Sequence, residues 1–253
     1  KFKASLSHDY YNVEIRRGGI RYWRPQIMSN DRDFYYKGVL HEYIEAPDGV
    51  TSGDAIGFHI ASGASGGARE KDPDTYRRDA RRLEDALDVE SDSFLRSRYT
   101  FYLGQSYRDS NQLEKALDAY LARSEMGYWT EEVYISLLEA GYLMDRLGRP
   151  VDEIADVYRR SIAVCGTRAE AFYHISDLYF RHGRNEEGFA AAKAGSHLVE
   201  PAGGLFLSKW VYDYGLLDKL AINAYWAGHY SECLEVCLKL LADNRLPLSE
   251  RAR

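Results

Sequence analysis

From residue 74 onward, hydrophobic residues recur at the three- and four-residue spacing of amphipathic helices. One face of the first such segment is apolar and carries Tyr76, Ala80, Leu83 and Leu87. The opposite face is basic and carries Arg77, Arg78, Arg81 and Arg82. These arginines form either a solvated face or a surface for a phosphate-bearing partner. Four helix pairs follow, predicted at about 94–126, 131–164, 169–198 and 214–243.

Residues 102–120 (YLGQSYRDSNQLEKALDAY) show how each pair is built. Gly104 and Ala116 are small enough for two antiparallel helices to approach closely, and Leu103, Tyr107 and Tyr120 supply apolar bulk between them. These residue types at these offsets resemble the tetratricopeptide repeat (TPR). Because such a unit cannot bury its own hydrophobic face, it predicts neighbouring repeats and therefore a helical solenoid.

The predicted turns between paired helices are regularly spaced. From Asn111 to Gly148 is 37 positions, from Gly148 to Gly183 is 35, and from Gly183 to Gly228 is 45. The first two intervals are close to the repeat period of about 34 residues. The third contains an insertion at 201–215, which predicts an extra turn or loop. Pro150 suits a helix start, and Asn185 is a candidate helix cap.

Residues 1–70 have a different pattern, with the alternation typical of strands. Strands are predicted at 11–16, 20–23 and 55–60, with a tight turn at Gly18–Gly19 between the first two. A further short apolar strand is predicted from 39–40 and 43–44, around His41 and Glu42. We interpret 1–70 as a partial α/β segment, with too few strands to close a core, and 71–253 as the helical repeats. The expected fold class is therefore mainly α.

One stretch of this first segment resembles a known enzyme family. Residues 38–43 (GVLHEY) follow Arg24 and the aromatic run 34–36. This order, continued through the glycine-rich segment near 65–70 and the repeats, resembles the C-terminal part of bacterial family 2 glycosyltransferases. In those enzymes a GT-A catalytic domain is followed by a TPR region.

The resemblance implies a role for several residues. Glu42 would be the acceptor-side base, with His41 beside it, and His59 would lie near the metal and diphosphate. Arg69 and Lys71 would neutralise phosphate charge on the sugar nucleotide. The full-length enzyme would use a divalent cation, Mg or Mn, a nucleotide-sugar donor, and a glycan, lipid or protein acceptor.

The metal-binding Asp-x-Asp motif of that family would precede residue 1, so the chain alone is not expected to catalyse transfer. The terminal residues, Lys1 and Arg253, look like cuts through a longer protein. The 31–33 triplet (DRD) has the motif's spacing but lies in a loop where the family keeps no metal. Without the resemblance, the sequence favours a structural hydrogen-bond pair for His41 and Glu42 over a catalytic one.

Composition limits the other possibilities. A formal net charge of −6 argues against general nucleic-acid binding. Three cysteines give no disulfide framework, and no apolar run is long enough to span a bilayer, so a cytoplasmic protein is expected. His229, Cys233 and Cys237 share a helix face, but Cys233 occupies a small-residue packing position, which favours packing over metal binding.

The first helix of each pair lines the concave face of a TPR solenoid. Candidate partner-binding residues on that face are Phe101, Arg108, Tyr142, Arg146, Tyr173 and Arg181. They either hold a partner, as an extended peptide or an acidic glycan, or they merely solvate the groove or dock on the adjacent catalytic domain. Two functions remain open on the sequence: the C-terminal portion of a glycosyltransferase, or a non-catalytic TPR interaction scaffold.

Overall fold

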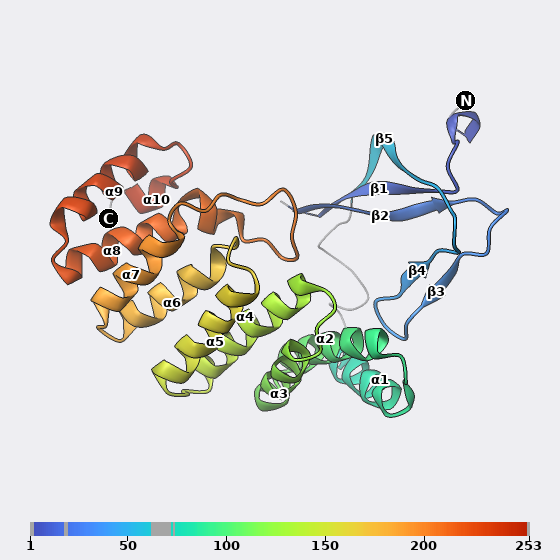
Figure 1. Ribbon diagram of the computed structural model, residues 1–253, viewed down its shortest axis with the longest axis horizontal. Helices are drawn as coiled ribbons and strands as arrows, with labels where there is room; N and C mark the ends of the chain where they lie inside the picture. The colour runs from blue at the N-terminus through green and yellow to red at the C-terminus, as the bar shows by residue number, and fades with distance from the viewer. Residues whose placement is uncertain (1–2, 18–19, 62–71, 73, 252–253) are drawn as a thin grey trace. The chain divides into compact units, whose positions relative to one another are not determined.

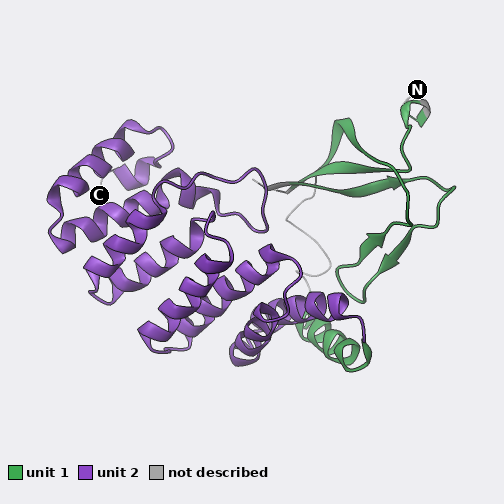
Figure 2. Ribbon diagram, viewed as in Figure 1, with its two compact units in different colours: residues 1–90 green, residues 91–253 purple. Residues whose placement is uncertain are grey.

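The computed structural model describes residues 3–17, 20–61, 72 and 74–251. The chain forms two compact units, residues 1–90 and 91–253 (Figure 2). Arg69, Lys71 and the predicted Gly18–Gly19 turn lie outside the described residues. Among the described residues, no helix has the length and apolar character needed to cross a bilayer.

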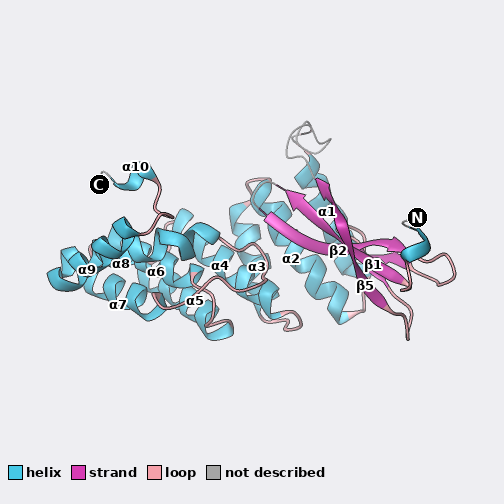
Figure 3. Cartoon of the chain, turned by 90° about the horizontal axis from the view of Figure 1, so that it is seen from above, coloured by secondary structure: helices cyan, strands magenta, loops and turns pink. Residues whose placement is uncertain are grey.

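The first unit contains a three-stranded sheet of order β2-β1-β5 (Figure 3). Its strands are β1 (Tyr10–Arg17), β2 (Ile20–Met28) and β5 (Ser52–Ala61), with β2 antiparallel and β5 parallel to β1. A 3₁₀ turn (Lys3–Ser5) precedes the sheet, and helix α1 (Thr75–Val89) ends the unit. Tyr11, Val13 and Ala55 form a small buried core. The three strands expected here are confirmed, although β2 and β5 are longer than predicted.

The strand predicted around His41 and Glu42 is wrong. The structure has a two-stranded hairpin, β3 (Tyr35–Lys37) and β4 (Tyr43–Glu45), and the pair lies in the loop between them. Gly38 and His41 have positive φ values of 113° and 53°, which turn the backbone and prevent an extended strand.

The second unit is a stack of helix pairs, as predicted (Figure 1). The pairs are α2 (Ser93–Asp109) with α3 (Leu113–Ser124), α4 (Thr130–Arg146) with α5 (Val151–Val164), α6 (Glu170–Arg181) with α7 (Asn185–Gly195), and α8 (Leu216–Ala227) with α9 (Tyr230–Ala242). A short helix, α10 (Leu248–Arg251), follows. Each helix from α2 to α9 contacts the next, so each pair covers the apolar face of its neighbour.

The four turns share one geometry. Each contains a single left-handed residue, Asn111, Gly148, Gly183 or Gly228, with φ between 59° and 85°. The next residue's amide bonds back to a carbonyl in the last helical turn, as Arg149 N–H does to Met144 at 2.9 Å. This pattern is the Schellman helix ending, and it explains why glycine and asparagine mark the turns.

The helix starts differ in one respect from the prediction. Asn185 is not a cap: Arg184 occupies the cap position and Asn185 is the first helical residue, with no side-chain cap bond. Pro150 does occupy the cap position of α5, where its missing N–H costs nothing.

Glycines allow paired helices to approach closely. A Cβ placed on Gly104 would lie 3.0 Å from the Tyr120 ring, and one on Gly141 would lie 2.5 Å from the Tyr158 ring. Ala116 of α3, the other small residue predicted between paired helices, is fully buried. The predicted small-residue positions therefore do bring the helices together.

The predicted insertion lies between α7 and α8. It comprises a loop at 199–208, hereafter the 199–208 loop, and a π-helical turn (Val211–Gly215) that leads directly into α8.

Candidate functional site

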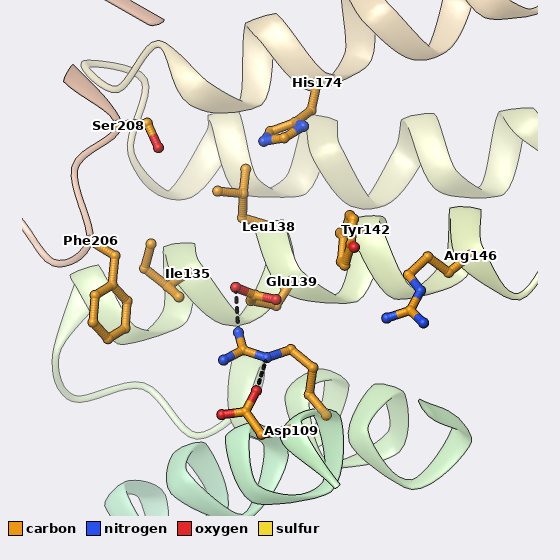
Figure 4. A pocket seen from close by; sticks show the side chains of 10 residues that line it. Asp109, Ile135, Leu138, Glu139, Tyr142, Arg146, His174, Phe206 and Ser208 are labelled. Carbon is orange, nitrogen blue, oxygen red and sulfur yellow. Dashed lines mark hydrogen bonds and ion pairs between the residues drawn. The ribbon is translucent and has the colours of Figure 1, made fainter. Parts of the chain in front are cut away.

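The second unit contains a groove of about 600 Å³ that runs along α4 (Figure 4). Ile135 and Leu138 of α4 form an apolar floor beside Phe206 of the 199–208 loop. Tyr142 and Arg146 lie further along the same helix. The remaining lining residues are Arg108 and Asp109 of α2, Glu139 of α4, His174 of α6, and Ser208 of the loop.

Arg108 lines the groove, as predicted, but its charge is already compensated. Its Nε donates to Asp109 at 2.8 Å, and its NH1 lies 2.8 Å from the Glu139 carboxylate. These contacts join the end of α2 to α4. Arg108 therefore shapes the groove wall and has little spare capacity for an anionic ligand.

Tyr142 and Arg146 are the predicted partner-binding residues best placed for contact. Tyr142 is 45% exposed, and the Arg146 guanidinium lies 5.8 Å from the centre of its ring. Arg146 is exposed, and no carboxylate of the described residues lies within ion-pair distance of it. Its hydrogen-bond donors are therefore available to a ligand.

Of the other three predicted partner-binding residues, one is buried and two do not line the groove. Phe101 is wrong as a partner-binding residue, because it is buried and packs edge-to-face on Tyr120 in the helix core. Arg181 is exposed but occupied, with ion pairs to Asp145 at 2.7 Å and Asp177 at 2.9 Å. Tyr173 is half-buried, and burial raises its pKa to about 12. Neither Tyr173 nor Arg181 lines the groove.

A buried ion-pair network, which was not predicted from the sequence, anchors the 199–208 loop. Arg168 and Glu170 are each 1% exposed and form a bidentate pair, with the shorter contact 2.7 Å. Arg168 also donates to Glu131 of α4 at 2.6 Å and to the Leu205 carbonyl at 2.9 Å. The Leu205 N–H in turn donates to Glu131 at 2.9 Å.

Glu170 completes this anchor. It accepts hydrogen bonds from the Ser208 N–H at 3.1 Å and the Tyr212 hydroxyl at 2.7 Å. Burial alone would raise the pKa of Glu170, but the bonds from Arg168, Tyr212 and Ser208 bring that pKa below its usual value. The loop is thus fixed to the starts of α4 and α6 by the buried Arg168 and Glu170 and by the partly exposed Glu131. The one sequence signal was an Arg-x-Glu triplet at the start of a helix.

Phe206 stands on this anchored loop with a left-handed backbone. Its φ is 51°, and its side chain is 54% exposed at the groove. We expect Phe206→Gly to be more stable than Phe206→Ala by about 1 kcal/mol, because only glycine adopts this φ without strain. Urea unfolding of both variants measures the difference. Equal stabilities, or a more stable alanine variant, would contradict the strain.

His174 lies at the back of the groove, stacked on Tyr158 with ring centroids 5.6 Å apart. Burial lowers its pKa, against the opposing effect of the nearby Asp177 and Glu170 carboxylates. The folded state therefore favours the neutral imidazole.

This lowered pKa has a pH-dependent consequence for stability. The unfolded chain binds a proton near the ordinary histidine pKa of about 6.5, so folding stability is lost as the pH falls through that value. Between pH 7.5 and 5.5, we expect wild type to lose more stability than His174→Phe. Chemical unfolding across this pH range measures the free energy of unfolding of both proteins. Parallel plots of that free energy against pH would show that His174 does not titrate as described.

The residues assigned to catalysis and metal binding lie on two different elements of the first unit. His41 and Glu42 are exposed in the β3–β4 loop, and His59 is exposed on β5, opposite Glu14 of β1. Within the described parts of the chain, no three His, Cys, Asp or Glu side chains are placed to share a metal ion.

Two weaker sequence patterns also have structural explanations. Arg32 of the 31–33 triplet pairs with Asp9 at 2.9 Å. His229 stacks on Phe189 and contacts the Glu186 carboxylate at 2.9 Å, while Cys233 packs against the core around α7 and α8.

Comparison with known proteins supports the helical fold. No protein-family model and no curated protein sequence matches the chain. Among solved structures, MamA is 13% identical, with 69% of this chain and 92% of that chain covered and a TM-score of 0.52. BtubC (BKLC) from P. vanneervenii is 15% identical, with 68% and 73% covered and a TM-score of 0.53.

A third structure is YrrB, described as a TPR protein with an unusual peptide-binding site. It is 13% identical, with 70% of this chain and 84% of that chain covered and a TM-score of 0.49. At such identities the likeness concerns the fold alone. The chain has a TPR-like helical fold, and the comparisons give no support to a GT-A domain.

Proposed function

We propose that this chain is a TPR-like interaction scaffold that binds an extended segment of a protein partner in the groove along α4. The observation that carries the proposal is the exposed Tyr142–Arg146 pair, which lies in one groove with the apolar floor of Leu138. Aromatic and arginine side chains of this kind dominate the binding energy of many protein interfaces.

The anchored 199–208 loop supports the same proposal. Its contacts with Arg168 and Glu170 hold Phe206 beside the groove before any partner arrives. A preformed wall lowers the entropy that is lost on binding, so affinity does not require a large interface.

Selection from a random peptide library on the full chain tests this function. We expect peptides to be enriched on wild type, and to be lost when Leu138→Glu places a charge on the groove floor. The thermal transition of Leu138→Glu should first be shown to match wild type. Absence of enrichment, or equal enrichment on both proteins, would overturn the proposal.

Sugar transfer is a second candidate, and it has the support of the resemblance of 38–43 to glycosyltransferases alone. In that case the repeats would hold the acceptor or a partner, and Glu42 would act as base. We expect the full-length protein to hydrolyse a nucleotide sugar in the presence of Mg or Mn, and Glu42→Gln to abolish the activity. Turnover unchanged by Glu42→Gln would remove this role.

A further inference from the structure

The two ends of the groove differ in chemistry. At one end Phe206 lies beside Ile135, and Leu138 lies one turn further along α4, so the lining there is apolar (Figure 4). At the other end Tyr142 presents an exposed ring and Arg146 an exposed guanidinium. An apolar ligand group is favoured at the first end by the area that it would remove from water.

The charges along the groove favour an acidic group at the second end. Asp109 and Glu139 both contact Arg108, so these three side chains together carry a net charge of −1, and an acidic ligand group is disfavoured beside them. His174 stays neutral near pH 7, because burial lowers its pKa. Arg146 is then the cation of the groove lining with free donors, and a carboxylate is the group that matches a guanidinium best.

The length of α4 sets the distance between the two ends. Ile135 and Arg146 are 11 positions apart and Leu138 and Arg146 are eight, which at about 1.5 Å per helical residue gives roughly 12–16 Å. An extended chain advances about 3.3 Å per residue, so this distance corresponds to about four or five ligand residues.

We infer that the groove takes an extended peptide with an apolar side chain and an acidic side chain four or five residues apart. The apolar side chain lies against Leu138 and Phe206, and the carboxylate is bound by Arg146. This inference rests on the proposed function and adds the identity of its ligand class.

A side-chain carboxylate fits this end better than a chain terminus does. Terminal carboxylates are usually captured by several converging backbone N–H groups. At this end the donors come from one long, exposed side chain at the last turn of α4. Such a group suits an aspartate or glutamate that passes by in the middle of a peptide.

The test uses nine-residue peptide libraries on the full chain, acetylated at the N-terminus and prepared with both an amidated and a free C-terminus. In each library one leucine is fixed, near the N-terminal end in one and near the C-terminal end in the other. A single glutamate is then placed at each of the remaining positions in turn. We expect the strongest retention when leucine and glutamate are four or five positions apart. For the best peptide, replacing glutamate with glutamine should weaken binding about tenfold, as expected for a charge-assisted hydrogen bond.

Arg146→Met should remove this preference for glutamate, with less than about a twofold difference between the glutamate and glutamine peptides. Arg149→Met is the matched control, because Arg149 is exposed, pairs with Glu114 and does not line the groove. It should keep the wild-type preference.

The outcomes separate this inference from the proposed function. Retention that does not depend on spacing, or a glutamate preference that persists in Arg146→Met, would overturn the inference. Binding restricted to peptides with a free C-terminal carboxylate would also overturn it. In each case, groove-dependent peptides from the random library would leave the scaffold function standing. If no peptide from either library binds, both fail.

Discussion

Arg168→Met is expected to lower the free energy of unfolding by about 3–5 kcal/mol, the usual cost of leaving one partner of a buried ion pair uncompensated. Its guanidinium holds Glu170, Glu131 and the Leu205 carbonyl, and its side chain is 1% exposed. Without it, Glu170 must either remain charged in a water-poor site or take up a proton. Urea unfolding followed by far-UV circular dichroism measures the loss.

Arg149→Met is the control for the stability measurement as well. Arg149 pairs with Glu114 at 2.7 Å, but the two side chains are 42% and 62% exposed. Exposed pairs contribute little because water and salt screen them, so we expect a loss of at most about 1 kcal/mol. Similar small losses in both variants would show that the buried network does not hold the 199–208 loop.

Gly141→Leu is expected to destabilise the second unit by about 3 kcal/mol, because overpacking in a tight core costs roughly 1–3 kcal/mol or more. Even a Cβ at this position would lie 2.5 Å from the buried Tyr158 ring. Helix propensity alone predicts the opposite sign, since leucine is favoured over glycine inside a helix. Thermal and urea unfolding therefore distinguish packing from propensity directly.

Gly203→Leu provides the comparison. No atom lies within 4 Å of a Cβ at Gly203, and its φ lies outside the left-handed region. We expect its stability to stay within about 0.5 kcal/mol of wild type, as for other surface substitutions. If Gly141→Leu were as stable as Gly203→Leu, the close contact of α4 and α5 would not be as described.

The helix pairs were predictable because their signals are local. The spacing of apolar residues sets the helices, and the left-handed turn residues Asn111, Gly148, Gly183 and Gly228 mark their ends. The strands of the first unit were recognised by alternation for the same reason. The hairpin at His41 was missed because an apolar pair, Val39–Leu40, precedes a backbone reversal that alternation does not reveal.

The groove was only partly predictable. Arg108, Tyr142 and Arg146 were found because they project from the first helices of consecutive pairs. Phe101 was misassigned because α2 buries residues around most of its circumference, so the repeat pattern did not identify the outward face. The role of Phe206 depends on contacts between residues about 37 and 74 positions apart, and no local pattern encodes such contacts.

Binding of a partner segment in the groove along α4 can be measured by titration calorimetry with the best library peptide. Tyr142→Ala removes a ring that is 45% exposed in the groove, while Tyr230→Ala removes a more exposed ring, 65%, from α9 outside the groove. We predict that Tyr142→Ala weakens binding at least about tenfold, in the range of an interface hot spot, and that Tyr230→Ala leaves Kd unchanged. Loss of affinity in Tyr230→Ala with wild-type affinity in Tyr142→Ala would contradict the account.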